Sequence, residues 1–423
     1  MAGFLCFEPH KRQGGALSIG FLPLVFPRFP AQHGAMTQRV VIHWGLSSLH
    51  GWGVYGLNLA MAWAGDEALE AATDYEIALR HVTLDPLQWH ALAGFQARSA
   101  KLRAQLLRQK SEPITVNAVV LSALGNDLQP QPGPHGGALL GRPSFGTIFF
   151  EREALGAKTR ETLATHAAII AGSSWNAAVL RAHGLPRVEL VLQGIDPALF
   201  HPAPRRGLFP GRFVVFSGGK LEARKGQDNV IAAWRIFAAR HPDALLISAW
   251  HNHWPEGARS IDASRRAASL PFRAAGTPDS AAWVAANGIR AEQFHDLGVV
   301  PNALMPAILR EADAALFPNR CEGGTNLVAM EAMACGVPCI LSANTGHLDL
   351  IKQGTALALA DQRPIHGVPG WRESNIEEIV AALEALYTDR ARAAAIGATG
   401  AQLLSGLTWA KTASEMKRII SAL

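Results

Sequence analysis

Cysteine is scarce in this chain, with four among 423 residues. Four cysteines do not make the disulfide framework of a small secreted domain, and three of them lie close together, at Cys321, Cys335 and Cys339. No histidine pair lies beside these three to complete a metal site. We therefore expect reduced, buried thiols in a cytosolic protein.

Long apolar runs and several catalytic motifs are also missing. The sequence has no uninterrupted apolar stretch of about 18 residues, so it predicts no transmembrane helix. It lacks G-x-x-x-x-G-K-[ST], G-x-S-x-G and H-E-x-x-H, which argues against P-loop phosphoryl transfer, serine hydrolysis and zinc-dependent proteolysis. The acidic D-x-D pair that often holds a metal ion is absent too, so we expect no metal.

What the chain does have is the composition and patterning of a well-packed α/β protein. It is 49% hydrophobic and 17% charged, with a modest net charge of +5. Its basic residues do not cluster in a tail that would suggest a nucleic-acid partner. Apolar strands alternate with helical segments from Arg39 onward, and the alternation restarts after the linker Ala203–Pro210. Such alternation predicts parallel sheets with helices on both faces. The predicted fold class is α/β, with two Rossmann-like, doubly wound domains facing a cleft.

The first residues do not fit this pattern. Two basic residues precede a short apolar run, Gly14–Phe26, but nearby prolines suit a signal peptide poorly. We expect a disordered extension there. The predicted boundaries are 1–35 for the extension, 36–205 for the N-terminal domain, 206–405 for the C-terminal domain and 406–423 for a terminal helix.

A glycine-rich turn follows the first predicted strand, Arg39–Trp44. Its G-x-G-x-x-G consists of Gly51, Gly53 and Gly56. Such glycines let the backbone approach a phosphate at a helix start, although tight strand–helix packing uses glycine as well. No acidic residue lies about 20 residues further on after a clear second strand, which argues against dinucleotide binding.

A long basic helix is predicted from Pro86 to about Lys110. Its basic residues alternate with leucines, and they are Arg98, Lys101, Arg103, Arg108 and Lys110. A basic amphipathic helix can lie on an anionic membrane, and the solvated face of a surface helix has the same pattern. Peripheral membrane contact through Arg98–Lys110 is therefore one of two interpretations.

Two turns after strands of the C-terminal half carry the residues with most chemical capacity. The first turn reads S-G-G-K-L-E-A-R-K-G and directly precedes a predicted helix. Its members are Gly218 and Gly219, which let the backbone approach a ligand, and the cations Lys220, Arg224 and Lys225. Two lysines beside a helix start make a strong site for a diphosphate.

The second turn follows the strand Ala314–Phe317 and leads into the helix Leu327–Ala334. The turn residues are Glu322, Gly323, Gly324, Thr325 and Asn326. Thr325 or Asn326 is expected to cap the helix, and Gly336 to end it in a left-handed conformation. Glu331 lies on this otherwise apolar helix, where its carboxylate either reaches solvent or needs a partner such as a ligand hydroxyl.

Together these motifs resemble the GT-B glycosyltransferases, specifically glycosyltransferase family 4. The resemblance covers roughly Arg39 to the C-terminus and is strongest in G-I-D-P-A-L-F-H-P, S-G-G-K-L-E-A-R-K-G-Q-D and E-G-G-T-N-L-V-A-M-E-A-M-A-C-G-V-P. It implies a nucleotide-sugar donor held by the C-terminal domain, an acceptor bound by the N-terminal domain, and metal-independent transfer with retention of configuration. A terminal helix, here Trp409–Leu423, would cross back to the N-terminal domain.

The resemblance also implies roles for single residues. Lys220 and Lys225 would hold the donor diphosphate and stabilise the leaving group. Glu322 would lie near the donor sugar, and Glu331 would bond the ribose. Gly53 matches the glycine loop that closes over the diphosphate. The rest of the implied donor site is Gly218, Gly219, Arg224, Gly323, Gly324, Thr325, Asn326 and Leu327.

Three departures from the family pattern stand out. Eight residues rather than seven separate Glu322 from Glu331. Lys220 replaces an arginine, which loses a bidentate fork. The histidine that members often carry after an N-terminal-domain strand has no counterpart in Thr147–Glu151. The candidates for its place are Glu151, Asn126–Asp127 and His135.

The sequence is thus interpreted as that of a cytoplasmic, retaining, metal-independent glycosyltransferase that needs no cofactor. It would move a hexose from a nucleotide-diphosphate sugar to a hydroxyl of a glycan, lipid-linked sugar or protein. One rival is a non-catalytic sugar-nucleotide-binding or scaffold protein on the same fold. Another is a nucleotide-sugar epimerase, which would need two carboxylates near the anomeric centre. The nucleotide base, the sugar and the acceptor are not indicated.

Overall fold

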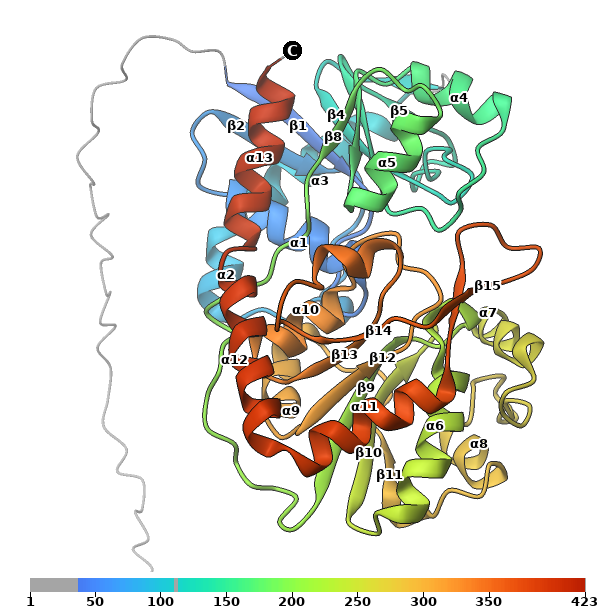
Figure 1. Ribbon diagram of the computed structural model, residues 1–423. Coiled ribbons are helices and arrows are strands. Elements are labelled where there is room, and N and C mark those ends of the chain that lie inside the picture. The colour runs from blue at the N-terminus through green and yellow to red at the C-terminus, as the bar shows by residue number, and fades with distance from the viewer. Residues whose placement is uncertain (1–36, 110–112, 423) are drawn as a thin grey trace, which may run out of the picture. The chain divides into compact units, whose positions relative to one another are not determined.

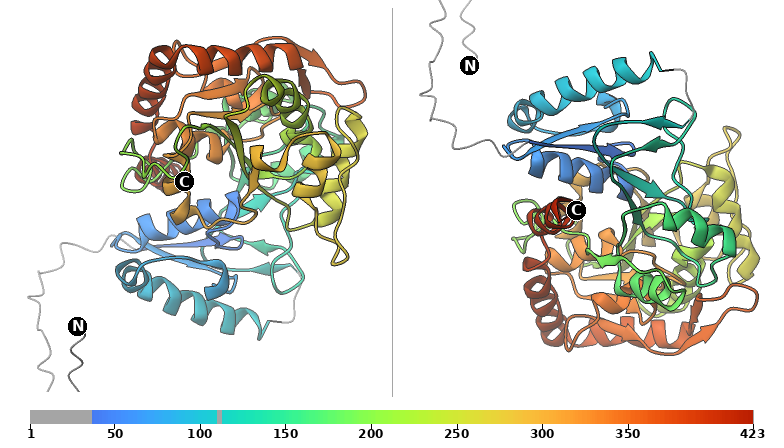
Figure 2. Two further views of the ribbon diagram at one scale, coloured as in Figure 1. Left: turned by 90° about the horizontal axis from the view of Figure 1, so that it is seen from below. Right: turned by 90° about the horizontal axis from the view of Figure 1, so that it is seen from above.

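The computed structural model describes residues 37–109 and 113–422 (Figure 1). The extension predicted at residues 1–35 lies outside the described residues. Two six-stranded sheets, one in each half of the described chain, are built from parallel strands with helices packed against them (Figures 1 and 2). The expected pair of doubly wound α/β domains is confirmed, whereas the exact domain boundaries stay predictions.

The N-terminal sheet has the order β2-β1-β4-β6-β7-β8, with every neighbouring pair parallel. Its strands are β1 (Gln38–His43), β2 (Leu69–Thr73), β4 (Val119–Leu124), β6 (Ser144–Ile148), β7 (Ala168–Ala171) and β8 (Val188–Leu190). Its helices are α1 (Gly51–Trp63), α2 (Pro86–Ala91), α3 (Ala93–Leu106), α4 (Ala157–Ala164) and α5 (Ser174–Ala182). The strand order reverses between β1 and β4, and ligands of such sheets bind outside the carboxyl ends of the strands at that point.

The C-terminal sheet has the order β11-β10-β9-β12-β13-β14, again all parallel. Its strands are β9 (Phe213–Lys220), β10 (Ala244–His251), β11 (Phe294–Asp296), β12 (Ala314–Phe317), β13 (Cys339–Ser342) and β14 (Leu357–Leu359). Its helices are α6 (Gln227–Arg240), α7 (Pro255–Ala258), α8 (Ser280–Ala286), α9 (Met305–Leu309), α10 (Leu327–Ala334), α11 (Ile376–Thr388) and α12 (Arg390–Ser405). Here the order reverses between β9 and β12, the two strands that precede the turns with Lys220 and Glu322.

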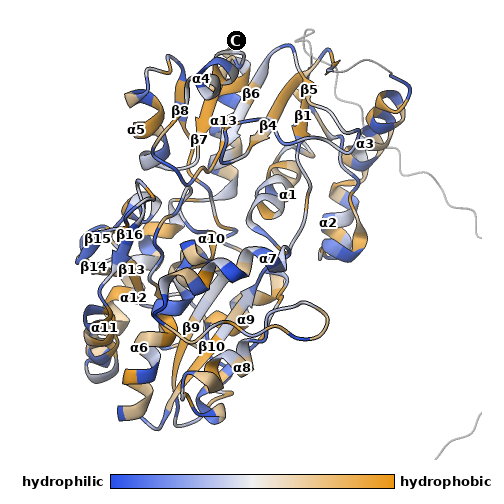
Figure 3. Ribbon diagram, turned by 90° about the vertical axis from the view of Figure 1, so that its right-hand side faces the viewer, coloured by the Kyte–Doolittle hydropathy of each residue, from blue (hydrophilic) through white to orange (hydrophobic). Residues whose placement is uncertain are grey.

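The interior of each domain is apolar because its strands are. Figure 3 shows hydrophobic residues concentrated along β1, β4, β9 and β10, and strands such as β4 and β12 are buried at every position. One buried cluster includes Ile42 and Leu59 of the N-terminal domain together with Phe317 and Met330 of the C-terminal domain. The two domains therefore share part of one apolar core.

The terminal helix α13 (Trp409–Ser421) returns to the N-terminal domain, as predicted (Figure 1). Trp63 of α1 donates from its indole nitrogen to the carbonyl of Ala413, 3.2 Å away. The hydroxyl of Tyr55 lies 3.6 Å from the sulfur of Met416. Lys417 pairs with Asp66 at 2.5 Å.

Three elements differ from the prediction. The helix expected over residues 86–110 is divided at Leu92 into α2 and α3, and Lys110 lies outside the described residues. β9 continues to Lys220, where a loop was expected, because Gly218 and Gly219 remain in register with β10. Helix α1 begins at Gly51, so the expected glycine loop is largely helix.

The basic helix α3 uses part of its charge within the fold. Arg98 donates to the carbonyl of Ala71 at 2.9 Å, and Arg103 donates to the carbonyl of Tyr75 at 3.0 Å. Lys101 and Arg108 are exposed. Across the described residues, no helix combines the length and apolar character needed to span a membrane.

Candidate functional site

A cavity of about 660 Å³ lies where the carboxyl ends of the two sheets face each other. Its N-terminal wall includes Trp44, which follows β1, and Gly125, which follows β4. Its C-terminal wall includes Lys220 at the end of β9 and Glu322 after β12. Both walls thus lie at the points where strand order reverses, and the volume is in the range of about 300–1,000 Å³ usual for small-molecule sites.

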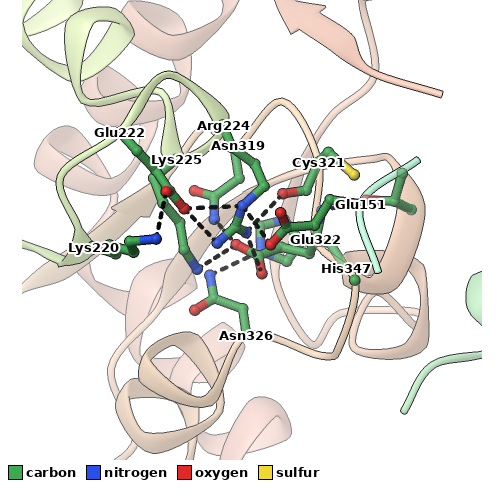
Figure 4. Close-up of polar contacts among 12 residues, drawn as sticks. Glu151, Lys220, Glu222, Arg224, Lys225, Asn319, Cys321, Glu322, Asn326 and His347 are labelled. Atoms are coloured by element: carbon green, nitrogen blue, oxygen red, sulfur yellow. Dashed lines mark hydrogen bonds and ion pairs between the residues drawn. The ribbon is translucent and has the colours of Figure 1, made fainter. Parts of the chain in front are cut away.

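The C-terminal wall holds a compact group of paired charges, drawn in Figure 4. Lys225 donates to one oxygen of Glu322 at 2.5 Å. Arg224 contacts three carboxylates: Glu151 at 2.7 Å, Glu222 at 2.7 Å and Glu322 at 3.1 Å. Glu151 comes from the N-terminal domain, so Arg224 joins the two walls.

Two neighbouring cations keep the carboxyl of Glu322 ionised. Burial raises the pKa of this carboxyl, but the charges of Lys225 and Arg224 outweigh burial and lower it to about 2. Asn319 also donates to the carboxylate. Burial lowers the pKa of Lys225, and Glu322 offsets this only in part. Lys225 and Glu322 therefore form an ionised pair that is buried from water.

Lys220 is the most accessible of the three cations. Its ammonium lies 2.9 Å from Glu222 and 5.0 Å from the ring centre of Trp254, and its side chain is 41% exposed. Gly219 before it has φ +127°, a conformation that residues with a side chain rarely adopt. This backbone turns the end of β9 toward the cavity.

Glu331 lies in a different environment in the same cavity. Its carboxyl accepts from the side-chain amide of Asn302 at 2.5 Å. Burial raises the pKa of Glu331 to about 8, against a smaller lowering by that hydrogen bond. The prediction that a buried Glu331 needs a partner is confirmed, and the protein itself supplies one partner.

The turn between the two carboxylates is fixed by close backbone contacts. A Cβ on Gly323 would lie 2.1 Å from the carbonyl oxygen of Phe149, so only glycine fits there. Asn326 has φ +63° and donates to His347 across 3.0 Å. Burial lowers the pKa of His347 to about 4, so the ring is neutral and accepts. The expected side-chain cap from Thr325 or Asn326 is wrong: no side chain caps the start of α10.

Most of the predicted donor residues line this one cavity. They are Gly219, Lys220, Arg224, Lys225, Glu322, Gly323, Gly324, Asn326, Leu327 and Glu331. Gly218, Thr325 and Gly53 are not among the lining residues.

Packing accounts for the position of Gly53. A Cβ there would lie 2.4 Å from that of Ser47, and its N–H bonds to His50. Gly51 and Trp52 line the cavity instead.

Of the candidates for the place of the missing histidine, Glu151 and Asn126 line the cavity, and His135 is not among the lining residues. Glu151 and Asn126 bond each other twice, at 3.0 Å in both directions. Asp127 is exposed and does not line it. His135 lies 3.1 Å from Asp74, which also bonds the buried His43 at 2.7 Å.

Sequence reasoning missed several partners because they lie far away along the chain. Asn302 is 29 residues from Glu331, and Glu151 is 73 residues from Arg224 by subtraction of their numbers. Arg320 pairs with Asp228 at 2.6 Å beneath the turn. Within the described part of the chain, no three His, Cys, Asp or Glu side chains gather as a metal site would require.

Comparison with known families and relatives agrees with this arrangement. Residues 212–389 match the family described as Glycosyl transferases group 1. The chain is similar to the D-inositol 3-phosphate glycosyltransferase of Pseudarthrobacter chlorophenolicus, with 26% identity over 263 residues, 59% of this chain and 54% of that protein. It is also similar to a GDP-mannose-dependent phosphatidylinositol monomannoside mannosyltransferase of Corynebacterium glutamicum, with 25% identity over 51% of each chain. The chain spans about half the length of the curated relatives it matches.

Solved structures resemble the chain over most of its length. The sucrose-phosphate synthase of Thermosynechococcus elongatus has a TM-score of 0.61 at 18% identity, covering 91% of this chain and 98% of that one. Anabaena HepE in complex with UDP and glucose has a TM-score of 0.60 at 13% identity, covering 91% and 100%. The likeness shows the two-domain GT-B fold. The chain therefore has the GT-B fold, and residues 212–389 of its C-terminal half are similar to the glycosyl transferases group 1 family.

Proposed function

We propose that this chain is a retaining, metal-independent glycosyltransferase of family 4, which moves a hexose from a nucleotide-diphosphate sugar to an acceptor hydroxyl. One observation carries the proposal. Lys220, Lys225 and the buried carboxyl of Glu331 line a single cavity at the switch point of the C-terminal sheet. A diphosphate and a ribose are the neighbouring parts of one ligand that suit these groups.

The diphosphate has two kinds of donor within reach. Lys220 and Lys225 supply charge, and Asn326, Leu327 and Val328 place the amino end of α10 at the cavity. Because no side chain caps α10, its first N–H groups are available to phosphate oxygens. The two lysines pair with Glu222 and Glu322, so a bound diphosphate would take over part of these contacts.

The ribose would bond the carboxyl of Glu331. Asn302 occupies one of its oxygens, which leaves the second for a ligand hydroxyl. With a pKa near 8, this carboxyl holds a proton at neutral pH and can both donate and accept. A protonated carboxyl can therefore accept a hydrogen bond from one ribose hydroxyl and donate one to the other.

Retention and metal independence rest on the residues at the reaction centre. The cations on the C-terminal wall can neutralise the charge of the leaving diphosphate, as a bound metal ion does in metal-dependent enzymes. With no histidine after β6, the donor phosphate itself would accept the proton of the attacking hydroxyl. A trehalose-6-phosphate synthase of the same fold, at 14% identity, is described as transferring with retention, which supports this choice by likeness of fold.

A thermal-shift panel of UDP, GDP, ADP and their sugars tests the proposal and selects the nucleotide. A ligand that binds only the folded state stabilises it in proportion to its concentration over its dissociation constant. One nucleotide and its sugars should raise the melting temperature. No shift with any of them would contradict the proposal. Proton NMR of the product with that donor then tests retention through the anomeric configuration.

We further propose a cytosolic location, since the three described cysteines are unpaired and buried. Contact with the inner membrane face would depend on two exposed cations, Lys101 of α3 and Arg108 just after it. Fractionation of cells that express Lys101→Glu/Arg108→Glu checks this, because loss of a membrane-bound fraction is the expected result if the contact exists.

A non-catalytic sugar-nucleotide-binding protein is the second candidate. It is favoured by the absence of histidine in Thr147–Glu151 and by the complete pairing of Glu322 with Lys225, Arg224 and Asn319. Release of nucleoside diphosphate from the donor upon addition of acceptor separates the two candidates, since a binding protein would hold the donor without releasing product.

A further inference from the structure

The two walls of the cavity differ in charge. Among the residues that the structure describes, every lysine and arginine lining the cavity comes from the C-terminal wall: Lys220, Arg224 and Lys225. Each of these is in contact with a carboxylate, of Glu222, Glu151 or Glu322. A donor diphosphate would use this positive charge, and little is left for a second anion.

The N-terminal wall is made of aromatic rings and amides. Trp44, Trp52, Tyr75 and Phe149 line it. The rings of Trp52 and Phe149 meet edge to face with centres 4.7 Å apart, and those of Trp44 and Trp52 are 5.4 Å apart. Such packing holds the rings rigidly at the cavity, where they can offer apolar surface to a ligand.

The polar groups of this wall suit hydroxyls. Asn126, Gln131 and Gln193 bring amides to the cavity, and Glu151 brings a carboxylate. The ring of His50 is neutral, because burial and the neighbouring His253 and His81 lower its pKa to about 4. Its Nδ1 accepts from Gly53, so its Nε2 carries the hydrogen and can donate.

We propose that the acceptor is an uncharged, hydroxyl-rich sugar that lies against the N-terminal wall and carries no phosphate near its reacting hydroxyl. This inference rests on the proposed function, because a transfer needs an acceptor opposite the donor, and the N-terminal wall is the side that the donor lysines do not occupy. Aromatic rings pack on the C–H face of a sugar, and amides and carboxylates bond its hydroxyls. A phosphate would meet Glu151 there and would lose its water, and the cation beside Glu151, Arg224, is already paired with three carboxylates. The acceptor would thus differ from the inositol phosphate in the name of a relative.

Matched acceptors test the proposal with the full-length protein and the donor selected by thermal shift. The pairs are glucose and glucose 6-phosphate, fructose and fructose 6-phosphate, and myo-inositol and inositol 1-phosphate. Methyl glycosides and maltose stand for the end of a glycan. Nucleoside diphosphate release should be stimulated by neutral compounds, and at least about tenfold less by the phosphorylated partners, the ratio that 1.4 kcal/mol of differential binding gives.

The results separate the acceptor proposal from the proposed function. Failure of every nucleotide to bind contradicts the proposed function. Donor binding together with preference for a phosphorylated acceptor, or with a response to phosphorylated compounds only, overturns the acceptor proposal alone. Donor binding without a response to any acceptor favours the binding protein and contradicts the proposed function. Response to methyl glycosides or maltose but not to free hexoses assigns the site to a glycan end.

A charge-introducing variant sharpens the test. Gln131 is exposed and lines the cavity, so Gln131→Arg should fold and place a cation on the N-terminal wall. The ratio of phosphorylated to neutral acceptor use should rise about tenfold, as one charged hydrogen bond allows. Gln105→Arg, at an exposed position of α3 that does not line the cavity, is the matched control. An unchanged ratio in Gln131→Arg would count against an acceptor on this wall.

The stacking part of the proposal is tested at Trp52. Trp52→Ala should raise the KM for the neutral acceptor roughly three- to tenfold, as loss of an aromatic contact predicts. The KM for the donor should stay unchanged, and Trp52→Phe should restore acceptor binding. Equal effects on both substrates would show damage to the fold rather than loss of an acceptor contact and would overturn the role of Trp52.

Discussion

Two buried carboxylates nine positions apart in one motif have opposite surroundings. Glu322 and Glu331 are each 4% exposed and both line the cavity. Glu322 lies against Lys225 and Arg224, and its pKa is lowered to about 2. Glu331 has an amide partner and apolar neighbours, and its pKa is raised to about 8.

The opposite pKa shifts of these two residues show that burial alone does not set the charge of a carboxyl group. Burial raises the pKa of both residues, and only the two cations beside Glu322 reverse its effect. The turn therefore has a fixed negative charge that pairs with Lys225 and Arg224, whereas the helix carries a carboxyl that is neutral near pH 7. Both surroundings suit one nucleotide. The charged group around Glu322 suits the diphosphate, and the neutral carboxyl of Glu331 suits hydrogen bonding to the ribose.

The largest expected effect of breaking this contrast is on stability. Glu322→Gln keeps the shape of the side chain but leaves Lys225 buried without its ion-pair partner. Removing one member of a buried pair costs about 3–5 kcal/mol. Urea unfolding at pH 7 should show a loss in this range.

Glu331→Gln is the matched control for that measurement. The carboxyl that the amide replaces is largely protonated in the folded protein at pH 7 but ionised in the unfolded chain. The variant lacks this cost of keeping a proton, so its free energy of unfolding should not fall and should rise by up to about 3 kcal/mol. Equal losses for the two variants would mean that the two surroundings do not differ as described.

A smaller effect is expected from pH. The pKa of Glu331 is about 8 in the folded protein and 4.5 ordinarily, so between these values the folded chain keeps a proton that the unfolded chain releases. The free energy of unfolding should therefore fall as pH rises through this window, by at most about 1.4 kcal/mol per pH unit. Glu322 acts in the opposite sense: its contribution is present above pH 4.5 and is lost as pH falls toward 2.

Urea unfolding of the wild type and Glu331→Gln across pH 5 to 8 isolates this contribution. As pH rises, the free energy of unfolding of Glu331→Gln should increase steadily relative to that of the wild type. Parallel curves for the two proteins would refute the raised pKa.

The smallest expected effect is that of metal removal. If lysines rather than a metal ion neutralise the diphosphate, transfer in EDTA should match transfer in Mg²⁺ within about twofold. A strict Mg²⁺ requirement in initial-rate measurements would contradict the lysine assignment.

Local pattern was enough to predict the elements that carry the site. Helix α10 and strand β12 have the predicted bounds, because each is an apolar run with clear end signals. The two turns lie at one cavity because parallel strands end on the same edge of a sheet. Gly336 ends α10 with φ +81°, as expected of a left-handed glycine.

The pairings within the site could not be read from local sequence. The bonds of Glu331 to Asn302 and of Arg224 to Glu151 arise from how the chain folds back. Glycines also misled the prediction, since Gly218 and Gly219 continue β9 and Gly53 packs within α1. In both places glycine marks close approach of other groups of the protein.

Calorimetric titration of the selected nucleoside diphosphate tests the placement of the donor diphosphate on Lys225. Lys225→Ala should weaken binding by about 1.5–3 kcal/mol, the range for a hydrogen bond to a charged group. Lys411→Ala, at an exposed position of α13, should bind as the wild type does. Unchanged affinity in Lys225→Ala would contradict the placement of the diphosphate on this lysine.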